Sequence, residues 1–283
     1  MKSSADTLTI SRKFDELKRR REGAYMAHVY YGDPNEEFSI RLIKTLAENG
    51  ADIIEVGIPF SDPTADGPTF QAACERALRG GMTPRMCIEG VARLRRDGLR
   101  TPIVLTTYYN IPYSIGVERF MAEIKEAGVQ AVIAPDLSFE EADEMVKVGR
   151  TLGLDVVFQI APTTDSGRLK KIIEAASGFL YIINVEGVTG AREVLSYSTL
   201  ELIRRVRART DIPLMTGFGI SKREHVVAPI SSGADGVVTG SAIAEIYARN
   251  LERPEETLPM VAKFAREIKM GCIEGFARRS MKG

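Results

Sequence analysis

One short pattern of polar and apolar residues returns three times along the chain. It has a glycine, a small or polar pair and then a short apolar run, and it occurs at residues 48–57 (ENGADIIEVG), 126–136 (EAGVQAVIAPD) and 231–240 (SSGADGVVTG). The glycine suits the left-handed residue that follows a helix C-terminus. The apolar run is typical of a strand buried in a parallel sheet. Each occurrence therefore predicts a helix, a tight turn and a strand.

Further apolar runs bring the number of predicted strands to eight. Helical periodicity lies between them, as in Phe38, Leu42 and Leu46, which are spaced four residues apart on one apolar stripe. Phe14 and Leu17 mark a short leading helix, and residues 260–270 mark a closing helix. The predicted strands are residues 24–31, 52–57, 102–107, 130–135, 155–160, 179–183, 212–216 and 235–239.

The alternation of strands and helices predicts a mostly parallel sheet. Eight such units in 283 residues favour an α/β fold of the (β/α)₈ TIM barrel type, with an extra N-terminal helix, over a doubly wound sheet. No GxGxxG follows the first strand, which further disfavours a dinucleotide-binding fold. We expect one barrel domain over residues 1–283, with flexible ends at about 1–10 and 278–283.

Charge and composition exclude several classes of function. Lys+Arg and Asp+Glu both total 38, so the chain lacks the basic excess that nucleic-acid binding needs. No apolar run reaches the roughly 18–20 residues of a membrane span, and the N-terminus has no apolar signal core, so we expect a cytoplasmic protein. Cys74, Cys87 and Cys272 are scattered, and with only His28 and His225 beside them a disulfide framework or a metal site is disfavoured.

The residues at the C-terminal ends of the strands are the candidates for chemistry, because barrel active sites lie there. Glu55 interrupts an apolar run and shares a face with Ile53. If that face is the interior, a costly buried carboxylate with a raised pKa results, which is the profile of a general acid or base. A glutamate satisfied by a polar neighbour is the alternative. The following loop carries Asp62 and Asp66, either of which could instead cap an Asx turn, and Asp66 lies far enough along the loop to fold over the barrel mouth.

Two glycine-rich turns follow the last two predicted strands. TGFGIS at 216–221 and TGSAI at 239–243 offer free backbone N–H groups, and in many barrels the loops after strands 7 and 8 bind phosphate. Plain capping turns are the alternative. The segment NVEGVTGAR at 184–192 could be a lid that closes over substrate, or a flexible connection.

Together these segments resemble the α subunit of the tryptophan synthase family. The matching strings are GDP at 32–34, EVGIPFSDP at 55–63, ADGP at 65–68, GVTGA at 187–191, GFGIS at 217–221 and GSAI at 240–243. They fall in the family's order across roughly residues 11–270. The resemblance implies a lyase that cleaves indole-3-glycerol phosphate to indole and glyceraldehyde 3-phosphate by a retro-aldol reaction, without a metal or organic cofactor. It also implies a pyridoxal-phosphate-dependent β subunit as a possible partner.

The resemblance further implies a role for individual residues. Glu55 moves protons at indole C3 and at the side-chain hydroxyl, and Asp66 polarises the indole N–H. The backbones of Gly190, Gly219, Gly240 and Ser241 match the phosphate site. The substrate pocket would be formed by His28, Phe70, Thr106, Tyr108, Ile133, Gln159, Tyr181, Thr189, Phe218 and Val238.

Three pocket positions depart from the family, which lines its indole pocket with apolar side chains. They are His28, Thr106 and Gln159, and a polar group left unpaired beside a bare indole ring costs about 1–3 kcal/mol. Tyr30, Tyr31 and Tyr109 are also unusual at their positions. Besides the α-subunit reaction, the sequence therefore leaves open aldol or retro-aldol chemistry on a more polar phosphorylated substrate. A non-catalytic activator of a β-like subunit is a further possibility, which Glu55 and Asp66 disfavour.

Overall fold

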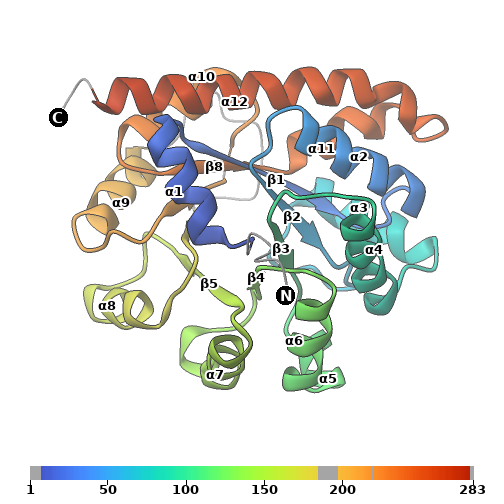
Figure 1. The fold of residues 1–283 in the computed structure, drawn as a ribbon, viewed down its shortest axis with the longest axis horizontal. Helices are drawn as coiled ribbons and strands as arrows, with labels where there is room; N and C mark the ends of the chain where they lie inside the picture. Colours follow the sequence, from blue (N-terminus) through green and yellow to red (C-terminus); the bar gives the residue numbers. More distant parts are fainter. Residues whose placement is uncertain (1–7, 184–196, 218, 281–283) are drawn as a thin grey trace, which may run out of the picture.

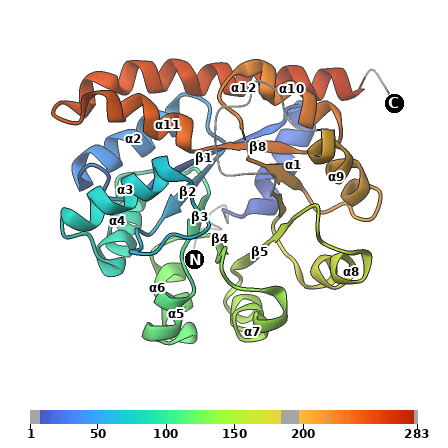
Figure 2. The same cartoon turned by 180° about the vertical axis from the view of Figure 1, so that it is seen from behind.

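Eight parallel strands close into a barrel in the order in which they occur along the chain (Figures 1 and 2). The computed structural model describes residues 8–183, 197–217 and 219–280. All eight predicted strands and the (β/α)₈ barrel are confirmed. The strands are β1 (Ala24–Tyr30), β2 (Ile53–Gly57), β3 (Ile103–Thr106), β4 (Ala131–Ile133), β5 (Asp155–Ile160), β6 (Leu180–Ile182), β7 (Leu214–Thr216) and β8 (Gly236–Thr239).

Helices surround the barrel, and α12 runs along one side of it, against α2 and α10 (Figure 1). This closing helix is longer than the predicted 260–270. Two helices separate β2 from β3, and two more lie between β3 and β4. The α-helices are α1 (Ile10–Arg20), α2 (Glu36–Glu48), α3 (Pro68–Arg79), α4 (Pro84–Arg96), α5 (Asn110–Ile115), α6 (Val117–Glu126), α7 (Asp143–Leu152), α8 (Ser166–Ala175), α9 (Tyr197–Arg207), α10 (Arg223–Ser231), α11 (Ser241–Tyr247) and α12 (Leu258–Ser280).

The leading helix α1 fills the end of the barrel at which the strands begin. Its apolar residues Ile10, Phe14 and Leu17 are buried and belong to the same cluster as inward-facing strand residues such as Ala24 and Ile53. The Thr9 hydroxyl caps the helix by accepting a hydrogen bond from the Arg12 backbone N–H. Of the ends expected to be flexible, residues 1–7 and 281–283 lie outside the described residues.

Strand register aligns polar residues near the opposite end of the barrel. Side chains alternate between the interior and the helices, so Ile53 in the interior cluster places Glu55 on the inward face as well. His28 on β1 is the register partner of Glu55 on β2, and Gly57 is the partner of Thr106 on β3. The interior is therefore apolar where the strands begin and polar where they end.

A buried ion pair ties the end of β1 to two helices. Asp33, which is fully buried, accepts bonds of 2.7 and 2.8 Å from the Arg76 guanidinium on α3. The hydroxyl of Tyr247 on α11 donates to the same carboxylate at 2.5 Å. This Asp33 cluster fixes α3 and α11 relative to β1, and both helices carry candidate site residues at their N-terminal ends.

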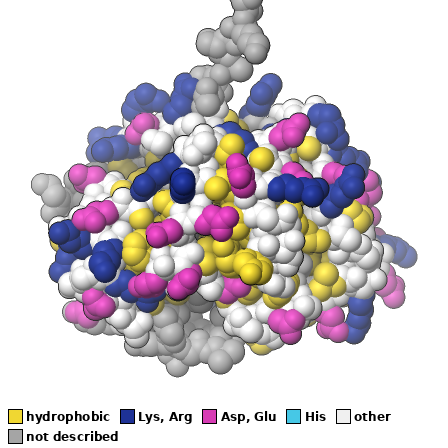
Figure 3. Space-filling view, turned by 90° about the horizontal axis from the view of Figure 1, so that it is seen from below, with side chains coloured by type: hydrophobic (Ala, Val, Ile, Leu, Met, Phe, Trp, Pro, Cys, Tyr) yellow, Lys and Arg dark blue, Asp and Glu magenta, His cyan; other side chains and the backbone are white. Residues whose placement is uncertain are grey.

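On the face shown in Figure 3, acidic and basic side chains are intermixed rather than forming a field of one sign. This distribution accords with the equal totals of acidic and basic residues. In the described part of the chain, no helix combines the length and the apolar character that crossing a membrane requires.

Candidate active site

Glu55 lies at the C-terminal end of the barrel interior, almost completely buried. Its Oε1 accepts a 2.5 Å hydrogen bond from the Thr106 hydroxyl, while Oε2 has no partner among the described residues. Burial, against the opposing effect of the Thr106 bond and with a smaller contribution from the nearby Asp66 carboxylate, raises the pKa of this carboxyl to about 7. At neutral pH both protonation states are therefore populated, which suits a group that must both give and take a proton.

His28 is the second buried titratable group of this layer. Its Nδ1 lies 3.5 Å from Glu55 Oε1, and its Nε2 has no partner in the described structure. Burial lowers the pKa of the imidazole to about 4, although the Asp66 carboxylate acts in the opposite direction. The ring is therefore neutral near pH 7. Thr106, by contrast, is not the unpaired polar group that the sequence suggested, because its hydroxyl is bonded to Glu55.

The buried Glu55 carboxyl makes the stability of the fold depend on pH. Between its ordinary pKa of 4.5 and about 7, the unfolded chain loses this proton while the folded chain keeps it, so the free energy of unfolding falls as pH rises. The difference corresponds to about 3 kcal/mol. We therefore expect Glu55→Gln to gain about 3 kcal/mol of stability relative to the unsubstituted protein between pH 4 and pH 8. Urea denaturation of both proteins at several pH values measures this, and a constant difference would contradict it.

Asp66 lies in the loop between β2 and α3, and two phenols hold its carboxylate. The hydroxyls of Tyr30 and Tyr108 donate to the same oxygen, Oδ2, at 2.6 and 2.7 Å. The side chain therefore does not form the Asx-turn cap considered above. Asp62, in the same loop, is exposed and accepts a 2.5 Å bond from the neighbouring Ser61 hydroxyl.

The rings of Phe70, His28 and Tyr30 pack together along one side of the site. Phe70, in the first turn of α3, lies 4.6 Å from the His28 ring and 5.1 Å from the Tyr30 ring, measured between ring centroids. The ring also lies against the backbone of Gly240, where a Cβ atom would approach it to 2.3 Å. Gly240 thus allows the loop after β8 to lie directly beside Phe70 and His28.

Three of the four predicted phosphate-binding residues, Gly219, Gly240 and Ser241, lie at the ends of β7 and β8. Gly240 precedes α11, and its carbonyl accepts bonds from the Ile243 and Ala244 N–H groups, so the N–H groups of Ser241 and Ala242 at the start of the helix lie before the first backbone bonds of the helix. Gly219 has a positive φ of 74° and is exposed, with open space at its Cβ position. A Cβ at Gly217 would lie 2.5 Å from the Tyr181 hydroxyl, so this phenol reaches from β6 across to β7.

Of the remaining predicted pocket residues, some lie in the barrel interior and others lie outside the described residues. Ile133 and Val238 are buried in the interior cluster, beside the partly exposed Tyr181. Gln159 is the register partner of Tyr181 and is partly exposed, and its side chain forms no hydrogen bond with another described residue. The predicted lid at 184–192, with Thr189 and Gly190, and also Phe218, lie outside the described residues.

Tyr30 is a member of this site that the sequence did not identify as one. The signal was present, because Tyr30 follows Met26 and His28 at the inward-facing spacing of β1. The contact between Tyr30 and Asp66 was not evident from the sequence, because the two residues are 36 positions apart and strand β2 lies between them.

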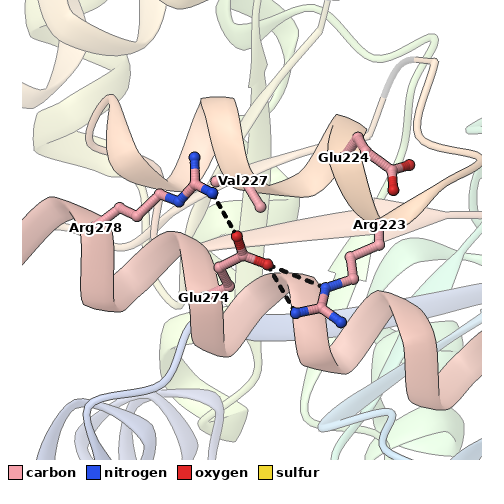
Figure 4. Close-up of a pocket in the computed structure, with 5 residues that line it drawn as sticks. All are labelled: Arg223, Glu224, Val227, Glu274 and Arg278. Carbon is pink, nitrogen blue, oxygen red and sulfur yellow. Dashed lines mark hydrogen bonds and ion pairs between the residues drawn. The ribbon is translucent and has the colours of Figure 1, made fainter.

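A different hollow, of about 360 Å³, lies between α10 and α12 on the outside of the barrel (Figure 4). Its Glu274 carboxylate is shared by Arg223 and Arg278, at 2.8 and 2.7 Å, so its charges are largely paired with each other. Within the described ranges, no group of three His, Cys, Asp or Glu side chains has the arrangement of a metal site.

Comparisons with known proteins agree on one family. The family model for the tryptophan synthase alpha chain matches residues 14–272. The tryptophan synthase alpha chain of Methanocaldococcus jannaschii is 46% identical over 87% of this chain and 86% of the relative, and that of Methanopyrus kandleri is 44% identical over 96% and 98%. A solved structure of Mycobacterium tuberculosis tryptophan synthase matches with a TM-score of 0.84 at 35% identity, covering 93% of this chain and 97% of that chain. The chain therefore belongs to the tryptophan synthase alpha chain family.

Proposed function

We propose that this protein is the lyase that cleaves indole-3-glycerol phosphate to indole and glyceraldehyde 3-phosphate. The observation that carries this proposal is the arrangement of two carboxylates at the barrel mouth. Glu55 is buried with a pKa near 7, and Asp66 is held above the strand ends by two phenols. The family to which the chain belongs supports the same activity.

The two carboxylates divide the retro-aldol reaction between them. Protonation of indole C3 breaks the aromaticity of the pyrrole ring, and positive charge develops at the ring nitrogen. The Asp66 carboxylate accepts a hydrogen bond from that N–H and stabilises the charge. Glu55 Oε2, which has no partner among the described residues, supplies the proton to C3 and then removes the proton of the side-chain hydroxyl. The C–C bond breaks as the hydroxyl becomes the aldehyde carbonyl, and its electrons restore the indole ring.

The phosphate group of the substrate is assigned to the ends of β7 and β8. The Gly240 and Ser241 backbone and the turn at Gly219 present N–H groups, which bind an anion without a charged side chain. Such an anchor fixes the distance from the phosphate to Glu55. A phosphorylated small molecule is therefore the substrate class for which this end of the barrel is suited.

Indole release from indole-3-glycerol phosphate by the purified protein tests the proposal. We expect release by the protein alone and faster release with a tryptophan synthase β subunit present. Absence of indole under both conditions, with the phosphate ester still bound by calorimetry, would overturn the proposed reaction while leaving the phosphate site in place.

A second candidate is the same chemistry on a more polar phosphorylated substrate. It is favoured by one observation: His28 Nε2 is buried without a partner in the described structure, in the same layer as Glu55. A hydroxyl or carbonyl on the ring system of the substrate would satisfy this nitrogen, whereas the indole ring itself has no oxygen and only its three-carbon chain carries hydroxyls. Competition experiments separate the two candidates, because a polar phosphate ester that is preferred would displace indole-3-glycerol phosphate at lower concentration.

The partner and the cellular location follow from the proposed reaction. Solved structures of tryptophan synthase are among the matches, and we propose that a β subunit takes up the indole that this chain releases. The cytoplasm is the proposed compartment, because phosphorylated intermediates are retained there and Cys74, Cys87 and Cys272 are buried free thiols.

A further inference from the structure

Two phenols converge on one oxygen of Asp66. Tyr30 comes from the last residue of β1, and Tyr108 lies just after β3, so two separate strands hold the loop that carries Asp66. Burial and the Asp66 charge raise the pKa of both phenols, so both remain protonated and act as donors to the carboxylate. A charge-assisted bond of this kind is roughly twice as strong as one between neutral groups.

Both phenols are themselves fixed by packing. The Tyr108 ring stacks on Phe60 with centroids 5.1 Å apart, and its hydroxyl also accepts a 3.1 Å bond from the Ala65 backbone N–H. The Tyr30 ring is buried and meets the Phe70 ring edge-on. Gly57 makes room for Tyr30, since a Cβ there would lie 2.7 Å from the ring.

The orientation of the Asp66 carboxylate is thus set from within the barrel. Two further hydrogen bonds fix the Asp66 backbone. Its N–H donates to the Pro63 carbonyl, and its carbonyl accepts a bond from the Gln71 side chain. With two donors on Oδ2, the other oxygen, Oδ1, is left for a ligand. Fixing such a group before substrate arrives lowers the entropic cost of the reaction.

We propose that Tyr30 is a positioning residue that holds Asp66 Oδ2, so that Oδ1 receives the ring N–H of the substrate. This inference rests on the proposed function, because it assigns the N–H of an indole ring to Asp66. Tyr108 holds the same oxygen from the end of β3 and also accepts a bond from the Ala65 backbone N–H, whereas Tyr30 ties the carboxylate to β1, so the two phenols fix it from two directions.

Two uncleavable ligands test the proposal through binding. One is an indole, the other a benzofuran without the ring N–H, and each carries a phosphorylated three-carbon chain. Tyr30→Phe keeps the aromatic ring and removes only the hydroxyl. We expect it to lower the affinity for the indole ligand by about 10- to 100-fold, which is the range for losing one hydrogen bond to a charged group. The affinity for the benzofuran ligand should be unchanged. Isothermal titration calorimetry measures both affinities.

Tyr31→Phe is the matched control. It removes the neighbouring phenol, whose hydroxyl donates to Glu36 rather than to Asp66, and we expect neither affinity to change. Equal weakening of both ligands by Tyr30→Phe would show a general structural role and overturn the proposal. Unchanged affinity for the indole ligand would overturn it as well.

Hydrogen exchange separates this inference from the proposed function. The Ala65 and Asp66 amides are hydrogen-bonded, and without the Tyr30 hydroxyl we expect them to exchange at least about tenfold faster in the absence of any ligand. Unchanged exchange would overturn the positioning role even if neither ligand bound. Failure of the unsubstituted protein to bind the indole ligand, with the exchange difference present, would overturn the indole assignment and the proposed function instead.

Discussion

Replacing Glu55 with glutamine is expected to lower kcat for indole release by about 1,000-fold, the magnitude of general acid–base catalysis by one well-placed group. Glutamine has nearly the same shape and can still accept the Thr106 hydrogen bond through its carbonyl oxygen. It carries no proton that can be transferred to C3 and cannot accept one from the hydroxyl. Binding of the substrate should change much less, because the proposed phosphate anchor at Gly240 and Ser241 is unaffected. Steady-state kinetics with indole detection give both quantities.

Glu126→Gln is a suitable control for this experiment. Glu126 is exposed at the end of α6, and its replacement should leave kcat unchanged. A Glu55→Gln protein with the kcat of the unsubstituted enzyme would remove this residue from the proton transfer. Together with the pH-dependent stability described above, the variant would be less active and, at pH 8, more stable. The burial that prepares Glu55 for catalysis is therefore also what destabilises the fold at high pH.

The second large effect is expected from Asp33→Ala, which should lower the free energy of unfolding by about 3–5 kcal/mol. The substitution leaves the Arg76 guanidinium and the Tyr247 hydroxyl without the acceptor that both share. The cost is large because Asp33 is completely buried and water cannot replace it. Urea denaturation at pH 7 measures the change.

An exposed ion pair provides the comparison. Asp97 and Lys44 are 2.8 Å apart with side chains 36% exposed, and such surface pairs contribute about 0–1 kcal/mol. We therefore expect Asp97→Ala to alter stability by less than about 1 kcal/mol. If Asp33→Ala is as mild as Asp97→Ala, the buried cluster does not anchor α3 and α11 as inferred.

The sequence predicted the barrel because its strand signals are local. A glycine after each helix and a short apolar run after the glycine are enough to predict a helix, a turn and a buried strand at Gly50, Gly128 and Gly233. Alternation along β2 then indicated that Glu55 and Ile53 share a face. These inferences needed no knowledge of which residues far apart in sequence come into contact.

The partners of the site residues could not be predicted in the same way. That Thr106 bonds to Glu55 depends on the register between β2 and β3, and a shift of one residue would direct the hydroxyl out of the barrel. That Tyr30 meets Asp66 depends on the path of a proline-rich loop. Both contacts arise from tertiary packing, so composition and spacing gave no indication of them.

The helix α1, which closes one end of the barrel, limits the directions from which substrate can enter and products can leave. Since α1 and the apolar layers around Ala24 and Ile53 fill that end in the described part of the chain, we expect molecules to reach Glu55 from the side where the strands finish. A cleavage reaction at a site closed on one side yields two products that leave by the side through which the substrate enters. We therefore expect each product to compete with the next substrate molecule for this single approach, which product-inhibition kinetics would measure.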